Sequence, residues 1–263
     1  MHFIIAQEKL PENANHFLKE SLNSPLLSEK MDYTVNKYDF SPIWLERNDA
    51  LLGFIDGNNY QRLKIKFLSI VKNPTDSSKY FVYGKSMVKS NICSFLGEIK
   101  IISIGQIKTD KEEKQSLFME YQDEGRRAKR FLSPEYLLLA EYSFYEDLKV
   151  KGSGKFEGIL KTNFYVYEDK VHYNDLRMET SDLFNNNQYV GTWTSYSTNK
   201  SKICNWGEFR IPYAENLDIG VGEFQPNEIY LSFGWKSYLK SLENKNDKTT
   251  KQAVEEEKRE WWK

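Results

Sequence analysis

The sequence predicts an all-β, mainly antiparallel protein, a barrel or a sandwich with short helical segments at its N- and C-terminal ends. Three observations predict this class: runs in which apolar and polar residues alternate, turn-forming clusters between the runs, and a 15% content of aromatic residues. Alternation with a period of two is typical of a strand with one buried face. Short strands with frequent turns favour a barrel or a sandwich over alternating strands and helices.

The composition and the charge of the chain argue against several classes of protein. Hydrophobic residues make up 40% of the 263 residues, enough for a sizeable core and too many for intrinsic disorder. The 37 Lys and Arg residues nearly balance the 38 Asp and Glu residues, so no overall positive field predicts nucleic-acid binding. No apolar run reaches the roughly 18 residues of a membrane-spanning helix. We therefore expect no nucleic-acid partner and no transmembrane segment.

Residues 1–48 are predicted to be a helical or irregular lead-in to the β-rich domain. Leu18 and Leu22 are spaced as neighbours on one face of a helix, and Asn13 or Asn15 is a candidate N-cap. The prolines that follow this segment interrupt the chain before the first strands.

The first residues of the chain allow two interpretations. They read Met1-His2-Phe3-Ile4-Ile5-Ala6-Gln7. This apolar run is shorter than a signal-peptide core, so the chain as written carries no signal peptide and the run is an ordinary N-terminus. The same residues also look like the end of such a signal, with Ala6 before the cleavage site. Under that second interpretation the protein is periplasmic or secreted; otherwise its compartment is open.

Residues 49–234 are predicted to form the β-barrel-like domain. Within it, Leu63, Ile65 and Phe67 alternate with basic residues, and Gly97 inside a later run is expected to mark a bulge or a bend. The residues expected to be buried are Leu63, Ile65, Phe67, Phe95, Ile99 and Trp193. Later strands are expected at 137–144, 155–160, 164–167, 171–173, 189–196 and 202–211, and a last strand or turn near 229–233.

Two charged segments accompany this domain. Residues 108–130 are dense in both charge signs and are predicted to be a surface insert with a short helix. Residues 235–263 are strongly polar towards their end and are predicted to form a C-terminal helix.

Two glycine–aromatic motifs occur late in the predicted domain, Gly154-Lys155-Phe156-Glu157-Gly158 and Gly191-Thr192-Trp193. With the hairpin rhythm of the chain, they resemble lipocalin-like (calycin) barrels and a group of uncharacterised bacterial envelope proteins. The resemblance implies that Trp193 closes one end of a barrel and that Arg210, on a late strand, stacks on its ring. Lipocalins place Gly-x-Trp on their first strand, whereas here it follows most of the strands. The resemblance implies a non-catalytic binder of a small apolar or amphipathic molecule in the barrel mouth.

The predicted ligand-binding residues are Trp193, Trp206 and Arg210. Trp44 and Trp235 are further candidates to line the mouth of the barrel. Aromatic side chains most often fill a core, and we expect at least two of these four tryptophans to do so.

Few residues suggest catalysis or metal binding. His172 is a candidate general base oriented by Asp175, or else an exposed strand histidine. Glu208, Asp218 and Glu223 lie near two glycines and suggest either a calcium site or ordinary turn chemistry. No EF-hand spacing is present, and we predict no metal and no cofactor.

Two cysteines, Cys93 and Cys204, each fall on a predicted strand. They are too few for a disulfide framework or a structural zinc site. Three interpretations remain open: buried small hydrophobic residues, a disulfide, or a reactive thiol.

Three functions follow from these observations. The first is a non-enzymatic small-ligand-binding barrel of the bacterial envelope. The second is a protein–protein interaction module that docks a partner through exposed aromatic residues and charged helices. The third is a hydrolase or isomerase that uses the acids around 208–223. The sequence favours a non-enzyme but does not determine the function, the ligand or the oligomeric state.

Overall fold

A computed structural model describes residues 10–24, 27–30, 34–55, 58–178, 183–243 and 245–263. The apolar residues 3–6, on which the signal-peptide interpretation depends, lie outside the described residues. No helix in the described part of the chain is both long and apolar enough to cross a membrane.

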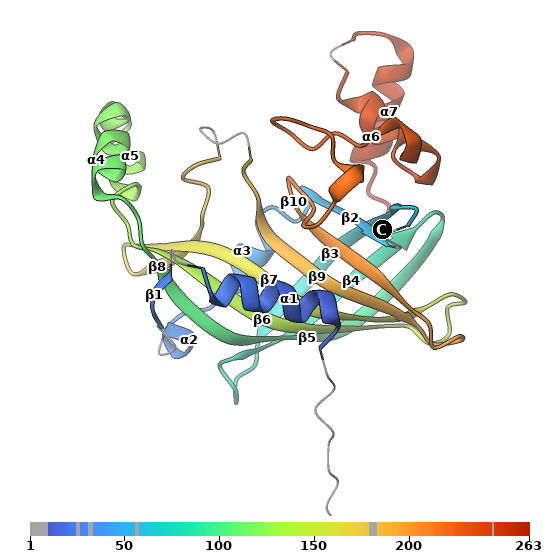
Figure 1. The fold of residues 1–263 in the computed structure, drawn as a ribbon, viewed down its shortest axis with the longest axis horizontal. Coiled ribbons are helices and arrows are strands. Elements are labelled where there is room, and N and C mark those ends of the chain that lie inside the picture. Colours follow the sequence, from blue (N-terminus) through green and yellow to red (C-terminus); the bar gives the residue numbers. More distant parts are fainter. Residues whose placement is uncertain (1–9, 25–26, 31–33, 56–57, 179–182, 244) are drawn as a thin grey trace, which may run out of the picture.

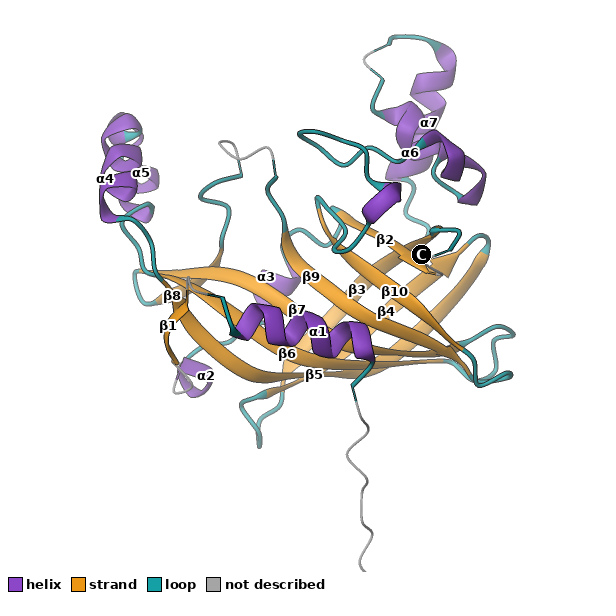
Figure 2. Cartoon of the chain, in the orientation of Figure 1, coloured by secondary structure: helices purple, strands orange, loops and turns teal. Residues whose placement is uncertain are grey.

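Eight antiparallel strands close into a barrel (Figures 1 and 2). Around the barrel the strands follow the order of the chain, and β10 pairs with β2 to complete the ring. They are β2 (Leu51–Ile55), β3 (Gln61–Lys72), β4 (Lys79–Val88), β5 (Asn91–Ile107), β6 (Glu135–Glu146), β7 (Gly154–Tyr167), β9 (Asn186–Ser195) and β10 (Ser201–Glu208). The predicted all-β, antiparallel class is confirmed, and the architecture is a barrel.

Two short strands lie outside the ring: β1 (Leu27–Lys30) pairs with β5, and β8 (Lys170–Tyr173) pairs with β7. The strands predicted at 155–160 and 164–167 are one continuous strand, β7. No strand forms at Ile229–Phe233, because residues Glu228–Phe233 make the 3-10 helix η3 between an Asn227 cap and the left-handed Gly234.

Helices cover the outside and one end of the barrel. They are α1 (Glu12–Leu22), α2 (Thr34–Lys37), α3 (Ser41–Leu45), α4 (Lys111–Glu120), α5 (Arg126–Arg130), α6 (Lys236–Ser241) and α7 (Lys248–Lys258), with short 3-10 helices η1 (Gln122–Glu124) and η2 (Glu215–Leu217). α1 lies across β7 and β9 (Figure 1), and α4 and α5 confirm the helix predicted in the charged insert.

The N-terminus of α1 differs from the prediction. Its N-cap is Pro11, so neither Asn13 nor Asn15 caps the helix. The Asn13 side chain instead donates a hydrogen bond of 2.8 Å to the carbonyl oxygen of Gly191 on β9. This bond, together with burial of Phe17 against the outer wall, holds α1 to the barrel.

The middle of the barrel is packed with aromatic side chains. Phe67 and Phe95 lie against Phe144, with ring centroids 5.7 and 5.1 Å apart, and Tyr189 stacks on Trp206 at 4.8 Å. Phe67 and Phe95 are buried, and so are the aliphatic residues Leu63, Ile65 and Ile99, as the period-two pattern predicted. The interior is therefore a solid core, as is usual in barrels of about eight strands.

One end of the barrel is plugged by α3. Trp44 is fully buried there, packs edge-on against Tyr80 at 4.8 Å, and donates through Nε1 to the Thr162 hydroxyl at 3.0 Å. We call this the plugged end. The other end, where the turns at 89–90, 147–153 and 196–200 lie, is the open end.

The glycines of the two sequence motifs make close contacts inside the barrel. Gly158 on β7 and Gly191 on β9 are cross-strand partners. A Cβ atom on Gly191 would lie 2.0 Å from the Glu157 carbonyl oxygen and 2.6 Å from the Tyr142 hydroxyl oxygen. Gly154 similarly leaves room for the indole of Trp193, 2.6 Å from where its Cβ would be. The motifs thus reflect close packing of two strands beneath bulky side chains.

Replacing Gly191 with alanine is therefore expected to lower the free energy of unfolding by about 1–3 kcal/mol, because the contacting atoms include backbone that cannot easily move. Urea unfolding monitored by circular dichroism measures the loss. Thr192→Ala, at the next and only half-buried position, is the control and should change stability by less than about 1 kcal/mol. Equal stability of Gly191→Ala and the unchanged chain would contradict the close approach.

Candidate functional site

The open end of the barrel contains a cavity of about 340 Å³. Each of the eight barrel strands contributes at least one lining side chain. The lining residues include Ile55, Ser86, Val88, Asn91, Cys93, Glu146, Phe156, Trp193, Lys202 and Phe233. We call this space the mouth cavity. Its volume lies at the lower end of the range for small-molecule sites.

A buried carboxylate, Glu146, lies in the wall of the mouth cavity. Only 6% of the residue is exposed, and it accepts hydrogen bonds from the Ser86 hydroxyl, the Gly154 amide at 2.8 Å and the Trp193 indole at 2.9 Å. Burial raises the pKa of Glu146 above its usual range, although these hydrogen bonds act in the opposite direction. The arrangement fixes the indole of Trp193 and places a buried acceptor in a wall that contains both apolar and polar side chains.

Trp193 and Cys93 both line the mouth cavity. Trp193 was predicted to be buried, but it is only half-buried, because its side chain lines this space. Cys93 is a buried free thiol, and so is Cys204 in the core, which excludes a disulfide between them here. Burial raises the pKa of Cys93 to about 12, which keeps the thiol protonated and disfavours its use as a nucleophile.

The other two predicted ligand residues lie elsewhere. Trp206 is fully buried in the aromatic core, one layer below the mouth cavity, where its ring is 5.9 Å from that of Phe156. Arg210 follows the plugged end of β10. Trp193 pairs with Lys202, and the six residue steps along the strand from Lys202 to Glu208 already separate these two positions by about 20 Å. The predicted stacking of Arg210 on Trp193 is therefore wrong.

Arg210 instead organises the glycine-containing loop that follows it. Its guanidinium is 2.6 Å from the Asp218 carboxylate and donates to the carbonyl oxygens of Gly220 and Gly222 at 3.0 and 2.6 Å. Of the three carboxylates considered as calcium ligands, Asp218 is thus paired with an internal cation. Among the described residues, no group of three or more His, Cys, Asp or Glu side chains is placed to hold a metal ion.

The candidate catalytic residues are not gathered into one site. His172 stacks on Tyr165 at 5.1 Å on the β7–β8 hairpin, and its Nε2 lies 3.3 Å from the Tyr167 carbonyl oxygen. Glu208 is buried inside the plugged end, where it accepts from the Tyr173 hydroxyl at 2.6 Å. Asp218 belongs to the loop around Arg210. The acids around 208–223 therefore do not form a shared cleft.

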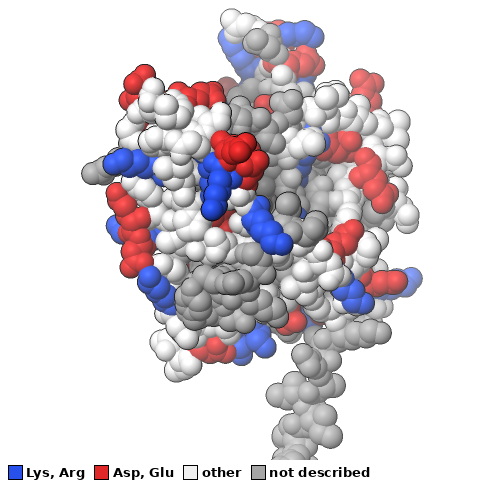
Figure 3. All heavy atoms as spheres, turned by 60° about the vertical axis from the view of Figure 1, so that its left-hand side comes forward, with Lys and Arg blue, Asp and Glu red and all other residues white. Residues whose placement is uncertain are grey.

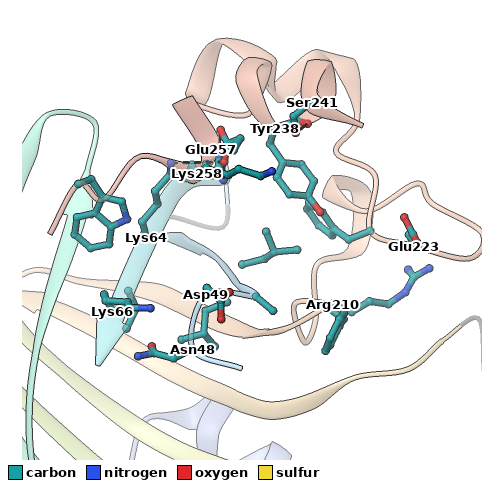
Figure 4. Close-up of a pocket in the computed structure, with 18 of the residues that line it drawn as sticks. Asn48, Asp49, Lys64, Lys66, Arg210, Glu223, Tyr238, Ser241, Glu257 and Lys258 are labelled. Atoms are coloured by element: carbon teal, nitrogen blue, oxygen red, sulfur yellow. Dashed lines mark hydrogen bonds and ion pairs between the residues drawn. The ribbon is translucent and has the colours of Figure 1, made fainter. Parts of the chain in front are cut away.

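A larger hollow of about 1070 Å³ lies outside the barrel, between β2 and β3 on one side and the C-terminal segment on the other (Figure 4). We call it the outer groove. Lys64 and Lys66 lie at one side of Figure 4, and Arg210 and Glu223 at the other. On the face shown in Figure 3, acidic and basic side chains are interspersed.

Glu146, the buried acceptor in the wall of the mouth cavity, was not among the residues predicted from the sequence. A signal was present: Tyr142 and Phe144 alternate inward on β6, and Glu146 continues their face at the end of the strand. Lys202 likewise continues the inward face of Cys204 and Trp206 on β10. In both strands, a charged residue occupies the inward-facing position nearest the strand end, after or before alternating apolar residues. This pattern could have indicated the cavity.

Comparison of the chain with protein-family models, with curated proteins and with solved structures found no match.

Proposed function

We propose that this chain is a non-enzymatic binding protein that holds a small amphipathic molecule in the mouth cavity. The observation that carries the proposal is that all eight strands turn a side chain into one space at the open end, above a solid aromatic floor. Ligand sites are concave and mostly apolar, with a few fixed polar groups, and they often lie in the mouths of β-barrels.

The lining suggests how such a molecule is oriented. Phe156 and Trp193 offer aromatic surface to an apolar body, and Glu146 is a fixed acceptor beside them. Lys202 and Asn91 are polar groups from strand ends at the same opening. Because the aromatic core fills the barrel below, the ligand is small and enters only the mouth.

The proposal includes a lipocalin-like barrel of a bacterial envelope. In its support, the barrel is closed, antiparallel and eight-stranded, and its strands follow chain order around the ring. The location rests on the resemblance of the hairpin motifs alone. Fractionation of cells that express the native reading frame tests it, and recovery in the cytoplasm contradicts it.

Trp193→Ala is expected to weaken binding of 1-octanol by about tenfold, because the indole supplies a large apolar wall. The Gly154 amide, which donates to Glu146 at the cavity, reports binding through its ¹⁵N–¹H NMR signal in both proteins. The concentration of octanol that half-saturates the shift is the measured quantity. Octylamine and octanoate, used in the same way, reveal which polar end the cavity accepts.

Trp262→Ala is the matched control, because Trp262 is also half-buried but lines the outer groove. It should leave the titration of the Gly154 amide unchanged. The proposed site would be contradicted if the octanol concentration that half-saturates the Gly154 shift were equal in Trp193→Ala and Trp262→Ala. It would also be contradicted if the Gly154 amide responded to none of the three probes.

A second candidate function is the docking of a protein partner on the outer barrel wall. Phe81, Tyr83, Leu96 and Tyr145 are exposed there, and Tyr83, Leu96 and Tyr145 are cross-strand neighbours on β4, β5 and β6. Contiguous apolar surface of this kind is typical of interaction sites. Sedimentation velocity of the unchanged chain and of Leu96→Glu tests the case in which the partner is a second copy: only the unchanged chain should associate.

A further inference from the structure

The outer groove combines a row of cations with aromatic walls. Arg62, Lys64 and Lys66 follow one another at every second position of β3, so all three project from the outer face of the barrel. Lys64 and Lys66 are labelled in Figure 4. Their Cα atoms are spaced by about 7 Å along the strand. Among the residues that the structure describes, none lines both this groove and the mouth cavity.

Arg62 is the structural member of this row. Its guanidinium forms a bidentate pair with Glu257 of α7, at 2.8 and 2.5 Å, and lies over the rings of Trp235 and Tyr238 at 5.2 and 5.3 Å. Bidentate geometry and aromatic stacking are the contacts for which arginine is suited. The pair fastens the C-terminal segment to the barrel and uses the carboxylate of Glu257.

Lys64 is a mostly buried cation that shares its nearby carboxylate, Glu257, with Arg62. Its Nζ lies 3.6 Å from Glu257, the same carboxylate that Arg62 holds at 2.5 Å, and only 15% of its side chain is exposed. Burial, and then the positive charge of Arg62, lower the pKa of Lys64. A second anionic group beside Lys64 would compensate the ammonium, since a buried charge is stable when it is paired.

Lys66 continues the positive surface towards an aromatic wall. Its Nζ lies 4.6 Å from the ring centroid of Trp262, which is a cation–π contact. An indole ring carries no net charge, so this contact does not neutralise the ammonium group. Further along the groove the lining includes Phe209 and Phe224. The groove thus offers cationic groups on β3 and apolar surface beside them. An amphipathic anion has a matching acidic group and apolar body.

We propose that the outer groove binds a small amphipathic anion, whose acidic group lies between Lys64 and Lys66 and whose apolar body extends along Trp262 towards Phe209 and Phe224. The charge balance of the lining supports this choice. Its cations are Arg62, Lys64, Lys66, Arg210 and Lys258, and its anions are Asp49, Glu223 and Glu257. Because Asp218, outside the lining, pairs with Arg210 at 2.6 Å, an excess of one positive charge remains, on the side of β3. This site differs from the mouth cavity in position and size.

Decanoate is the probe for this proposal, and the indole N–H signal of Trp262 is the reporter. Replacement of Trp262 by phenylalanine assigns that signal. In the unchanged chain, decanoate should shift the Trp262 signal at concentrations that leave the Gly154 amide of the mouth cavity unaffected. Decylamine, with the same chain and the opposite charge, should require at least about tenfold more to produce the same shift.

The double variant Lys64→Gln/Lys66→Gln should bind decanoate about tenfold more weakly or worse, because two charge-assisted contacts are removed. Lys79→Gln/Lys100→Gln is the matched control: these lysines are cross-strand partners on β4 and β5, and both line a different surface hollow. It should bind decanoate like the unchanged chain. Thermal unfolding of each variant shows whether it is folded.

Three results would overturn the proposal. One is a shift of Trp262 that is equal for decanoate and decylamine, and another is unchanged decanoate affinity in the folded Lys64→Gln/Lys66→Gln variant. The third, a response of the Gly154 amide without one of Trp262, would assign the anion to the mouth cavity. That outcome would leave the proposed function standing and remove this inference.

Discussion

Replacing Phe67 with alanine is expected to lower the free energy of unfolding by about 3–5 kcal/mol. Phe67 is 2% exposed and lies in the centre of the barrel, with its ring 5.7 Å from those of Phe144 and Tyr189. Its neighbours come from separate strands, β6 and β9, so the space left by the ring cannot be closed by a shift of one element. Urea unfolding followed by near-ultraviolet circular dichroism measures the loss.

The adjacent residue provides a matched control. Leu68 on the same strand points outward and is 38% exposed. Leu68→Ala should change the free energy of unfolding by less than about 1 kcal/mol, since more than a third of the residue is already exposed and its side chain is not part of the core. A loss below about 1 kcal/mol at Phe67 as well would mean that the inward face of β3 is wrongly assigned.

The inward face of β3 illustrates what could be predicted from the sequence. Leu63, Ile65 and Phe67 alternate with basic residues, and this local period alone identifies both the strand and its buried side. The same reasoning could not foresee that Arg62 is buried, because its cover comes from Glu257, at the far end of the chain. Period-two patterning assigns faces but not the distant segments that pack on them.

The residues of the mouth cavity could not be predicted from the sequence, because their grouping depends on the register between the strands. The spacing between Trp193 and Arg210 is compatible with a hairpin, and so it suggested contact. The turn at 196–200 pairs Trp193 with Lys202 and carries Arg210 to the opposite end of β10. The strand-like residues of Glu228–Phe233 form a 3-10 helix for a related reason: Asn227 and Gly234 fix the backbone at its two ends.

Glu208 is another buried carboxylate of the barrel, at the plugged end. It is 0% exposed, accepts from the Tyr173 hydroxyl at 2.6 Å, and accepts from the Asn187 side chain at 2.8 Å. Asn187 also accepts from Thr162, which in turn accepts from Trp44 of α3. The carboxyl group is therefore connected by hydrogen bonds to the helix that plugs the barrel.

Burial raises the pKa of Glu208 to about 7, outweighing the two hydrogen bonds that stabilise its charged form. The ordinary value of 4.5 applies to the unfolded chain. Between these two pH values the folded protein retains a proton that the unfolded chain has lost. The stabilisation linked to this proton is fully present below pH 4.5 and decreases as the pH rises towards 7, by about 3 kcal/mol in all.

The unchanged chain should therefore lose stability between pH 5 and pH 7.5 relative to Glu208→Gln, which carries no titratable group at this position. Urea unfolding of both proteins across this interval measures the difference, and other titrating groups cancel in the comparison. Glu223→Gln, a change at an exposed carboxylate, is the control and should follow the unchanged chain. If Glu208→Gln and the unchanged chain show parallel pH profiles, the Glu208 carboxyl group is ionised throughout this range, and the plugged end tolerates its charge.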